Sequence, residues 1–584
     1  MELPTANALP EEVWRAIARE IADYYLQRPW ETSRKTEYLI GSRISSRKVA
    51  QEEEDRGWNI PLLPQKYMGI NRHFFNYYLD AMYGEVRWTK LDQRMVTQLE
   101  RLQSPIIASH VRRLQIRAWF VDYLMKRDEA GGPKAGLLPA IRNLQSRILS
   151  SLSMSVKAKE DKKLPFPTQE AEYARSFAEG RLVTAISSQT LLRLMISAVH
   201  NMRGVVGYLF EQRDLSLTKQ TERFIAMASR SLGPGLRKLS LHATIFKCKP
   251  IFDLTEFKHL EELELHFDYH CHSAESQVAE AIEASKQREV EALQSTIVPF
   301  INSRKSVLRS LTLASYSHVD LSPFFRALGP FPALRMLSLN VCLDELHLSD
   351  VGVLVEFIYI HRWTLSHLDI RPRTPDSSGS DFVSTAHLAE LRSASWIRLQ
   401  KGLFERSDIF VSLEGLHLPV GDFDSCIRLI HRTSSSLTHL SLTDHYFNDA
   451  NEIKRLLGIF SSRPFQLQSL WLEVPAPTVE TLKLLASRLP GLNSLVLLFE
   501  CKYNGGAFLE NMATVLDGQI DWNVQHITIV ARKNMQVSPE DAALLGIVTS
   551  GPDTSTACMD AVVKVVPSVK SYKGVHWHRK VFSH

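Results

Sequence analysis

The sequence predicts an α/β solenoid, in which short parallel strands and helices alternate, preceded by a small all-α module. A hexapeptide with leucine at its first and fourth positions, and leucine or isoleucine at its sixth, recurs at a regular spacing. Helical patterns of apolar residues follow these hexapeptides. The chain of 584 residues is also too long for one compact core. A repeat protein can be this long without dividing into several compact domains, because its core lengthens with each added unit.

The hexapeptide occurs in nine well-formed copies and one weaker copy, VQHITI. Its alternating leucines lie on one face of a strand, and the residues between them lie on the other. Successive copies are 24 to 32 residues apart, except for two steps of 48. Each long step fits either two units with one degenerate strand or one unit with an insertion. The period is typical of leucine-rich repeats. The copies begin at residues 236, 260, 308, 334, 365, 413, 437, 467, 492 and 524.

Helices are expected on the other side of each unit. Residues 448–464 and 478–492 each carry apolar side chains three and four positions apart, which form a single stripe on a helix. A strand and a helix of this kind cannot bury their leucines alone, so the units must stack on one another. The Asn or Cys that leucine-rich repeats place three residues after the last leucine occurs only at Cys342. The turns are therefore degenerate.

The chain upstream of the hexapeptides carries weaker signals of the same kind. VRRLQI at 111–116 resembles an earlier strand, and the apolar run 191–210 reads as one helix followed by another around Val205. The first, irregular repeats would then begin near residue 105. We expect four regions in all: a helical module at 1–88 with a charged insertion at 27–59, helices and irregular first repeats at 89–235 with a polar loop near 153–168, the repeat solenoid at 236–535, and a C-terminal cap and tail at 536–584.

Composition argues against several classes of function. The 69 basic and 64 acidic residues leave a net charge of +5 with no concentrated basic face, so we expect no binding to nucleic acid. No stretch approaches the roughly 20 consecutive apolar residues that span a bilayer, and we expect no membrane partner. The N-terminal sequence lacks the pattern of a secretory signal. Six cysteines lie far apart with no CxxC pair, which favours the reducing cytoplasm or nucleus.

Motifs of catalysis are absent from the sequence. There is no P-loop, no dinucleotide-binding GxGxxG after a strand, no HExxH and no GxSxG. We therefore expect a protein that is not an enzyme and has no cofactor. The segment HFDYHCH at 266–272 gathers residue types that ligate zinc, but no distant CxxC or HxxxH supplies a complete set of four ligands. We expect no metal site.

The N-terminal module carries a family resemblance. LPEEVWRAIA at 9–18 begins with Leu-Pro and two acidic residues, which are favourable in the first turn of a helix. A second apolar segment contains LLPQKYMGINRHFF at 62–75. Together the two segments resemble an F-box, and the repeats follow it as they do in fungal F-box proteins with leucine-rich repeats. The charged residues 27–59 stand where that family has only a short link.

The resemblance implies a substrate-recognition adaptor of an SCF-type cullin–RING ubiquitin ligase. The module would dock on the Skp adaptor of the ligase, and the repeats would bind a substrate protein that the sequence does not identify. The alternative is a protein-binding scaffold without a ligase role, whose N-terminal helices only cap the first repeat. The positions that the family uses for docking correspond here to Leu9, Pro10, Val13, Ile17, Leu63, Ile70 and Phe74.

The strand residues between the leucines should form the surface that binds a substrate. Trp471 is a large aromatic residue of the kind that anchors protein interfaces. Histidine recurs on this face, which fits either a surface whose charge changes between about pH 5 and 8 or simple tolerance of histidine on half-exposed strands. The candidate substrate-binding residues are Glu262, Glu264, His266, His367, Asp369, Arg371, His417, His439, Trp471 and Glu473.

Overall fold

The described residues of the computed structural model form two compact units, one ending at Leu260 and the other beginning at Glu261. The predicted insertion at 27–59, the polar loop near 153–168 and most of the predicted C-terminal region lie outside the described residues. The structure describes residues 9–26, 64–89, 91–129, 186–212, 218–252, 257–267, 279–315, 317, 319–371, 394–406, 408, 410–433, 435–447, 450–464, 466–474, 479–500, 522–532, 566, 568, 571 and 572.

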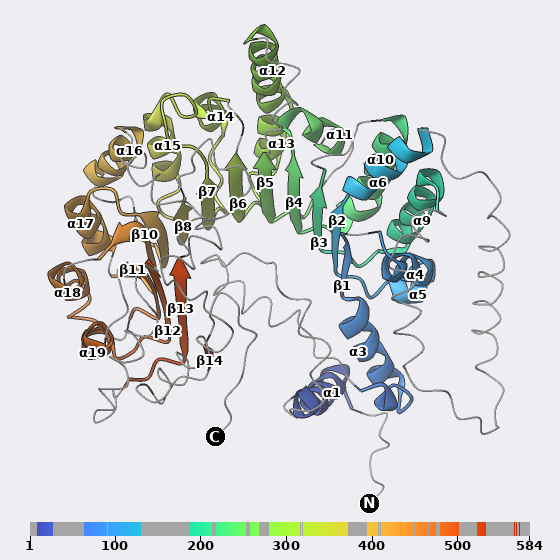
Figure 1. Ribbon diagram of the computed structural model, residues 1–584, viewed down its shortest axis with the longest axis horizontal. Helices are drawn as coiled ribbons and strands as arrows, with labels where there is room; N and C mark the ends of the chain where they lie inside the picture. Colours follow the sequence, from blue (N-terminus) through green and yellow to red (C-terminus); the bar gives the residue numbers. More distant parts are fainter. Residues whose placement is uncertain are drawn as a thin grey trace, which may run out of the picture. The chain divides into compact units, whose positions relative to one another are not determined.

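The first unit contains four parallel strands that pair in chain order. The register aligns Val86, Leu114, Tyr208 and Leu239, so equivalent buried side chains of successive repeats stack on one another. These strands are labelled in Figure 1: β1 (Glu85–Trp88), β2 (Arg113–Arg117), β3 (Gly207–Glu211) and β4 (Lys238–Ala243).

Helices of the first unit begin at residues that cap them. Asn71 accepts a hydrogen bond from the Phe74 amide at the start of α3, and Thr218 and Thr221 form a reciprocal capping box at the start of α10. The helices are α1 (Glu11–Leu26), α3 (Arg72–Tyr83), α4 (Gln93–Arg101), α5 (Pro105–Ala108), α6 (Trp119–Glu129), α9 (Ser188–Asn201), α10 (Lys219–Leu232) and α11 (Lys249–Phe252), with short 3₁₀ turns η3 (Gln65–Tyr67), η5 (Gly233–Gly235) and η6 (Ile245–Cys248).

Two expectations upstream of the hexapeptides were wrong. The run 191–210 is not two helices, because α9 ends at Asn201 and the chain continues into strand β3. At Gly204, a Cβ atom would lie only 2.9 Å from the carbonyl oxygen of Ser109, so this crossing needs glycine. The repeats also begin earlier than expected, since β1 lies within the predicted helical module. The strand expected at 111–116 is confirmed as β2.

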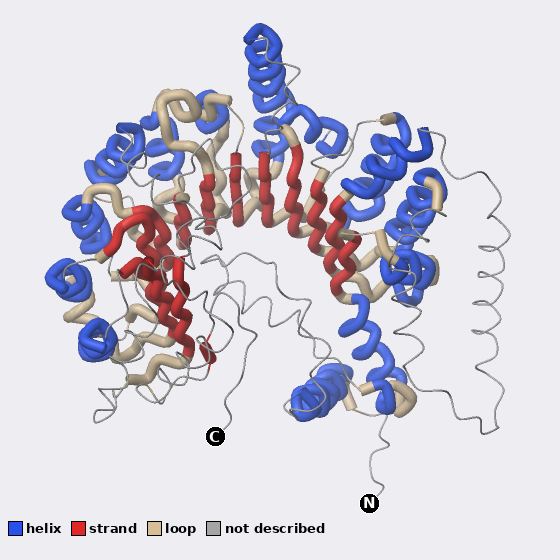
Figure 2. The backbone as a smooth tube through the Cα atoms, in the orientation of Figure 1, coloured by secondary structure: helices blue, strands red, loops and turns tan. Residues whose placement is uncertain are grey.

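The second unit continues the same plan, with parallel strands paired in chain order and helices on one side of them (Figures 1 and 2). Every hexapeptide copy from residue 236 onward forms a strand, which confirms a leucine-rich-repeat type of fold. The strands are β5 (Glu262–Phe267), β6 (Ser310–Ser315), β7 (Met336–Asn340), β8 (His367–Ile370), β9 (Gly415–Pro419), β10 (His439–Tyr446), β11 (Ser469–Val474), β12 (Ser494–Glu500), β13 (His526–Arg532) and β14 (Ser571–Tyr572).

Both 48-residue steps are single units with insertions. Strand β5 pairs directly with β6, and β8 pairs directly with β9, so no degenerate strand lies between them. A long helix, a π-helical segment and a further helix fill the first insertion, and α16 lies in the second. The helices of the unit are α12 (Ala279–Ala292), η7 (Leu293–Ile297), α13 (Val298–Ser303), α14 (Ser322–Ala327), α15 (Val351–Ile360), α16 (Ala394–Glu405), α17 (Phe423–Thr433), α18 (Ala450–Gly458) and α19 (Val479–Arg488).

The marker leucines of the hexapeptides form the core of the second unit. Burial of each such side chain contributes about 1.5–3 kcal/mol relative to an exposed one. Leucines of neighbouring strands lie in register, so the core is a continuous column rather than a central cluster. None of the described helices is long and apolar enough to cross a bilayer. The column consists of Leu263, Leu311, Leu337, Leu368, Leu416, Leu440, Leu470, Leu495 and Ile527.

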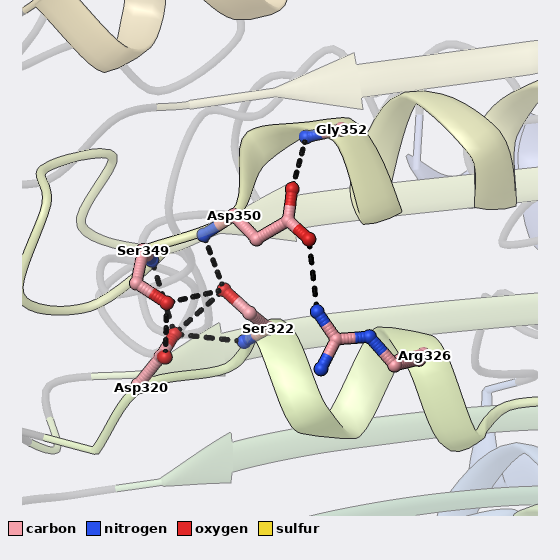
Figure 3. Close-up of polar contacts among 6 residues, drawn as sticks. All are labelled: Asp320, Ser322, Arg326, Ser349, Asp350 and Gly352. Atoms are coloured by element: carbon pink, nitrogen blue, oxygen red, sulfur yellow. Dashed lines mark hydrogen bonds and ion pairs between the residues drawn. The ribbon is translucent and has the colours of Figure 1, made fainter.

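A polar network joins two successive repeats where their strands lead into helices (Figure 3). The Asp320 carboxylate accepts hydrogen bonds from the amide and hydroxyl of Ser322 at 2.9 and 2.7 Å, and from the Ser349 amide at 3.1 Å. The neighbouring Asp350 accepts a hydrogen bond from Arg326 of α14 at 2.8 Å. The network ties the start of α14 to the start of α15, and thus fixes one repeat against the next.

Candidate functional site

The N-terminal module is a pair of helices with its own small core. Ala18 and Ala22 of α1 pack against Phe74 and Tyr77 of α3. The indole of Trp14 meets the Phe74 ring edge-on, with centroids 5.8 Å apart. Because Phe74 and Tyr77 are three positions apart, they lie on the same face of α3 and turn together toward α1.

A carboxylate ties this helix pair to the first repeat. Asp80 of α3 accepts a hydrogen bond from Arg15 of α1 at 2.9 Å, and its second oxygen lies 2.6 Å from Nδ1 of His110. The Asp80 side chain is largely buried at this junction. The carbonyl oxygen of Gly84, at the end of α3, accepts two amide hydrogen bonds from the segment that enters β2. The module is therefore anchored to the repeat through side chains and backbone.

The predicted docking residues divide into an exposed set and a buried set. Leu9, Val13 and Ile70 are 42%, 40% and 57% exposed, and Pro10 is exposed as well. Phe74 is only 3% exposed. Ile17 is half-buried against the helix-pair core, so these two side chains hold the helices together instead of forming an open surface. Leu63 lies outside the described residues. Sequence reasoning missed other exposed apolar residues of the first unit, among them Phe75, Met82 and Ile106.

The predicted substrate-binding residues lie along the strand face of the second unit. Strand register aligns Ser338, Asp369, His417, Ser441 and Trp471 on five neighbouring strands, β7 to β11. We call these five residues the central row. Each lies between two core side chains of its strand, which places it on the face opposite the helices.

The central row contains an ion pair beside a histidine. The guanidinium of Arg371, just after β8, donates two hydrogen bonds to Asp369, at 2.9 and 2.8 Å. The hydroxyl of Ser338 donates to the same carboxylate at 3.2 Å. Nε2 of His417 lies 3.9 Å from Asp369, and its ring stands edge-on to the Trp471 indole. Charge on the row is therefore balanced at one end, and aromatic surface dominates at the other.

Three buried polar atoms of the central row have no hydrogen-bond partner among the residues that the structure describes. They are Nδ1 of His417, Oγ of Ser441 and Nε1 of Trp471. Leaving such an atom unpaired costs about 1–3 kcal/mol, so the row carries unused donor and acceptor capacity. His417 is 6% exposed, and Trp471 is half-buried. The row is thus more enclosed than the exposed surface expected from the sequence.

Burial also decides the charge of His417. Desolvation by burial and the nearby Arg371 charge lower its pKa and Asp369 raises it, and together they bring the pKa to about 3. The imidazole is therefore neutral throughout the range of about pH 5 to 8, where a histidine switch would operate. Of the two alternatives for the recurrent histidines, His417 therefore favours simple tolerance on the strand face over a pH-responsive surface. Burial lowers the pKa of His367 as well, while Glu414 raises it.

A second row, next to the central row, brings two histidines together over a glycine. Register aligns His367 of β8, Gly415 of β9 and His439 of β10, and the two imidazole centroids are 6.4 Å apart. A Cβ atom at Gly415 would overlap the His367 ring. Nδ1 of each histidine is hydrogen-bonded to the hydroxyl of the preceding residue, Ser366 or Thr438. The hydroxyls fix the orientation of both rings.

The remaining candidates lie on the same strand face but are less open than expected. Glu262 and His266 are half-buried, and Glu264 and Glu473 are buried. Neighbouring parallel strands are only about 4.8 Å apart, so long side chains of adjacent repeats cover one another. Within the described residues, no group of three or more His, Cys, Asp or Glu side chains could hold a metal ion. The other candidate ligands of the 266–272 segment lie outside those residues.

Comparisons with known proteins give structural similarities only. No family model matches the chain, and no curated protein matches it. Among solved structures, it is similar to the yeast Rad7 and Elc1 complex, at 15% identity over 72% of this chain and 90% of that chain, with a TM-score of 0.37. It is also similar to the leucine-rich-repeat-containing protein LegL7 from Legionella pneumophila, at 13% identity over 64% of this chain and 96% of that chain, with a TM-score of 0.31.

Proposed function

We propose that this protein is the substrate-recognition adaptor of an SCF-type cullin–RING ubiquitin ligase. Its helix pair would dock on the Skp adaptor, and its repeats would bind the substrate protein. One observation carries the proposal: Leu9, Val13 and Ile70 remain exposed, although the helix pair buries other apolar residues in a core of its own. Exposed apolar side chains on a small helical module are what a hydrophobic partner groove accepts.

The strand face supports the second half of the proposal. The central row offers an aromatic ring, a half-buried ion pair and, among the described residues, unpaired donors and acceptors on consecutive repeats. Such a mixture of apolar contact and polar specificity is typical of protein-binding surfaces. In this proposal the chain performs no catalytic step of its own. It would act in the cytoplasm or nucleus, where the buried thiols of Cys248, Cys342 and Cys426 remain reduced.

Co-purification with the Skp adaptor tests the docking half. The full-length chain should retain the adaptor, and the combined variant Leu9→Ala, Val13→Ala and Ile70→Ala should lose it. Ile106→Ala is the matched control, because Ile106 is an exposed apolar residue of the same unit outside the predicted docking set. Circular dichroism should show that the variants remain folded. Absence of adaptor binding both in the full-length chain and in a variant lacking residues 27–59 would overturn the proposal.

The capping role is a second candidate, and the junction at Asp80 favours it specifically. Helix α3 runs directly into β1, and Asp80 contacts both Arg15 and His110. If the helix pair acts only as a cap, its removal should lower the free energy of unfolding of the repeats, and no variant should bind the Skp adaptor. Adaptor binding that depends on Leu9, Val13 and Ile70 distinguishes the two functions.

A further inference from the structure

A pocket opens in the second unit and is lined by residues outside the strands. It lies between the end of α16 and the last turns of α17, and its volume is about 170 Å³. Phe410 and Leu429 are its buried apolar residues, and Val411 is 47% exposed. The lining residues are Arg406, Phe410, Val411, Leu429, Arg432, Thr433 and Ser435. The pocket is large enough for one apolar side chain.

Two arginines, one lining the pocket and one bonded to a residue that lines it, are held by backbone carbonyl groups. Arg432, in the last turn of α17, donates from Nη1 to the carbonyl oxygen of Phe404, and its guanidinium lies over the Phe404 ring. Arg463, one unit later, likewise donates from Nη1 to a backbone carbonyl oxygen, that of Ser435, at 3.0 Å. Among the described residues, neither arginine has a carboxylate within ion-pair distance. Each guanidinium has five N–H groups, so most of its donors are unused.

A third arginine is only partly neutralised. Arg406 forms an ion pair with Glu356 at 2.7 Å, and its guanidinium lies 4.2 Å from the centre of the Tyr359 ring. Arg406, Arg432 and Arg463 therefore place three guanidinium groups at or beside the pocket, and among the described residues only Arg406 of the three is paired with a carboxylate. Because backbone carbonyls and aromatic rings already position these groups, little side-chain entropy remains to be lost when a ligand binds.

We propose that this pocket binds an acidic segment of a partner protein, which inserts an apolar side chain between flanking carboxylates. The apolar side chain would contact Phe410, Val411 and Leu429, and the carboxylates would accept hydrogen bonds from Arg432 and Arg463. Planar guanidinium groups match carboxylates with two parallel hydrogen bonds, which suits them to this role. The lining residues come from α17 and from the loops after α16 and α17, not from the strands, so the pocket gives the protein a second binding surface that does not depend on the ligase role.

Binding of short labelled peptides to the full-length chain tests the inference by fluorescence anisotropy. The probe is a peptide with leucine between two glutamates on each side, and the comparison peptides carry lysine in place of glutamate or alanine in place of leucine. The glutamate–leucine peptide should bind at least about tenfold more tightly than the lysine peptide, and its affinity should fall as salt is raised. Absence of binding by the glutamate–leucine peptide, or equal binding of the lysine peptide, would refute the proposal.

Variants of the pocket locate the binding site. Arg432→Gln should weaken binding about fivefold, which is the scale of a partly exposed charge pair. Val411→Glu should abolish it, because the new carboxylate neutralises Arg432 and fills the pocket; at this exposed position the fold should tolerate the change. Arg455→Gln is the control, since Arg455 is an exposed arginine that contacts Phe423 outside the pocket. Unchanged affinity in both pocket variants would overturn the assignment.

Discussion

His417 and Trp471 meet edge to face across an intervening strand, with ring centroids 6.1 Å apart and an angle of 89° between their planes. Ser441 of β10 lies between them in the register. Residues on strands two apart are about 9.6 Å from each other along the sheet, so only large side chains span that distance. The two rings therefore arch over the small Ser441, which explains why its hydroxyl is buried. The same contact makes Trp471 part of the packed surface rather than a free anchor.

Stability should depend on pH through His417. The folded pKa is lowered from 6.5 to about 3, so between these values the unfolded chain takes up a proton that the folded protein does not. The contribution of this residue is therefore complete above about pH 6.5 and is lost progressively below it. Chemical denaturation of the wild type should show a fall in unfolding free energy that is steeper than in His417→Asn, by up to about 1.4 kcal/mol per pH unit.

The control for this comparison is His431→Asn. His431 is exposed in the last turn of α17, away from the central row. Between pH 6 and 4, the unfolding free energy of the His431→Asn variant should fall with the same slope as that of the wild type, within the error of the measurement. Identical slopes for the wild type and His417→Asn would mean that His417 is protonated in the folded protein, contrary to its enclosed position.

Gly415→Ala should destabilise the protein by about 1–2 kcal/mol through overpacking. The new Cβ would overlap the His367 ring, which must then move and lose its hydrogen bond to Ser366. Replacing His367 by alanine in the same chain should recover part of the loss, because the two residues are in contact and their effects are not additive. Urea unfolding of the two single variants and the double variant measures this coupling. Additive losses would show that the ring does not occupy the space above Gly415.

The strands were largely predictable because each carries its own signal. Alternating leucines specify a strand and the face it buries, and this pattern marks every strand from β4 to β13. Strands β1 and β3 were missed for a physical reason. EVRW and GYLFE lack the leucine pattern, and they become strands because β2 lies beside both of them and pairs with their backbones. The lengths of the two insertions were visible in the sequence, but whether a hidden strand lay within them depended on tertiary pairing.

The candidate site was predictable in position but not in environment. The residues between the leucines do lie on one face, since that follows from strand geometry alone. The burial of His417 depends on Trp471, two repeats further on, and no local pattern records such a contact. The pocket around Arg432 was missed for the same reason, because a loop, a helix end and the next repeat form it together.

His361→Leu should destabilise the second unit by about 1–3 kcal/mol, the cost of a buried amide that loses its acceptor. Nε2 of His361 accepts a hydrogen bond from the Phe331 amide at 2.9 Å, so the proton resides on Nδ1, which donates to the carbonyl oxygen of Phe357 at 2.7 Å. Burial lowers the pKa of this histidine, although the hydrogen bond to Phe357 raises it. His361→Gln, which keeps an acceptor, should lose less stability in urea unfolding. Equal losses in the two variants would exclude the amide hydrogen bond as the cause.

Asp320→Ala should loosen the contact between two repeats, as the network in Figure 3 indicates. Burial raises the pKa of Asp320, but hydrogen bonds from Ser349 and Ser322 lower it more, so the carboxylate remains charged at neutral pH. Losing a charged acceptor of several hydrogen bonds should cost about 1.5–3 kcal/mol. Hydrogen exchange should quicken at the starts of α14 and α15. Arg326→Gln is the control, because its ion pair with Asp350 is exposed and should contribute less than about 1 kcal/mol. A comparable loss in that variant would place the main link at Asp350 instead.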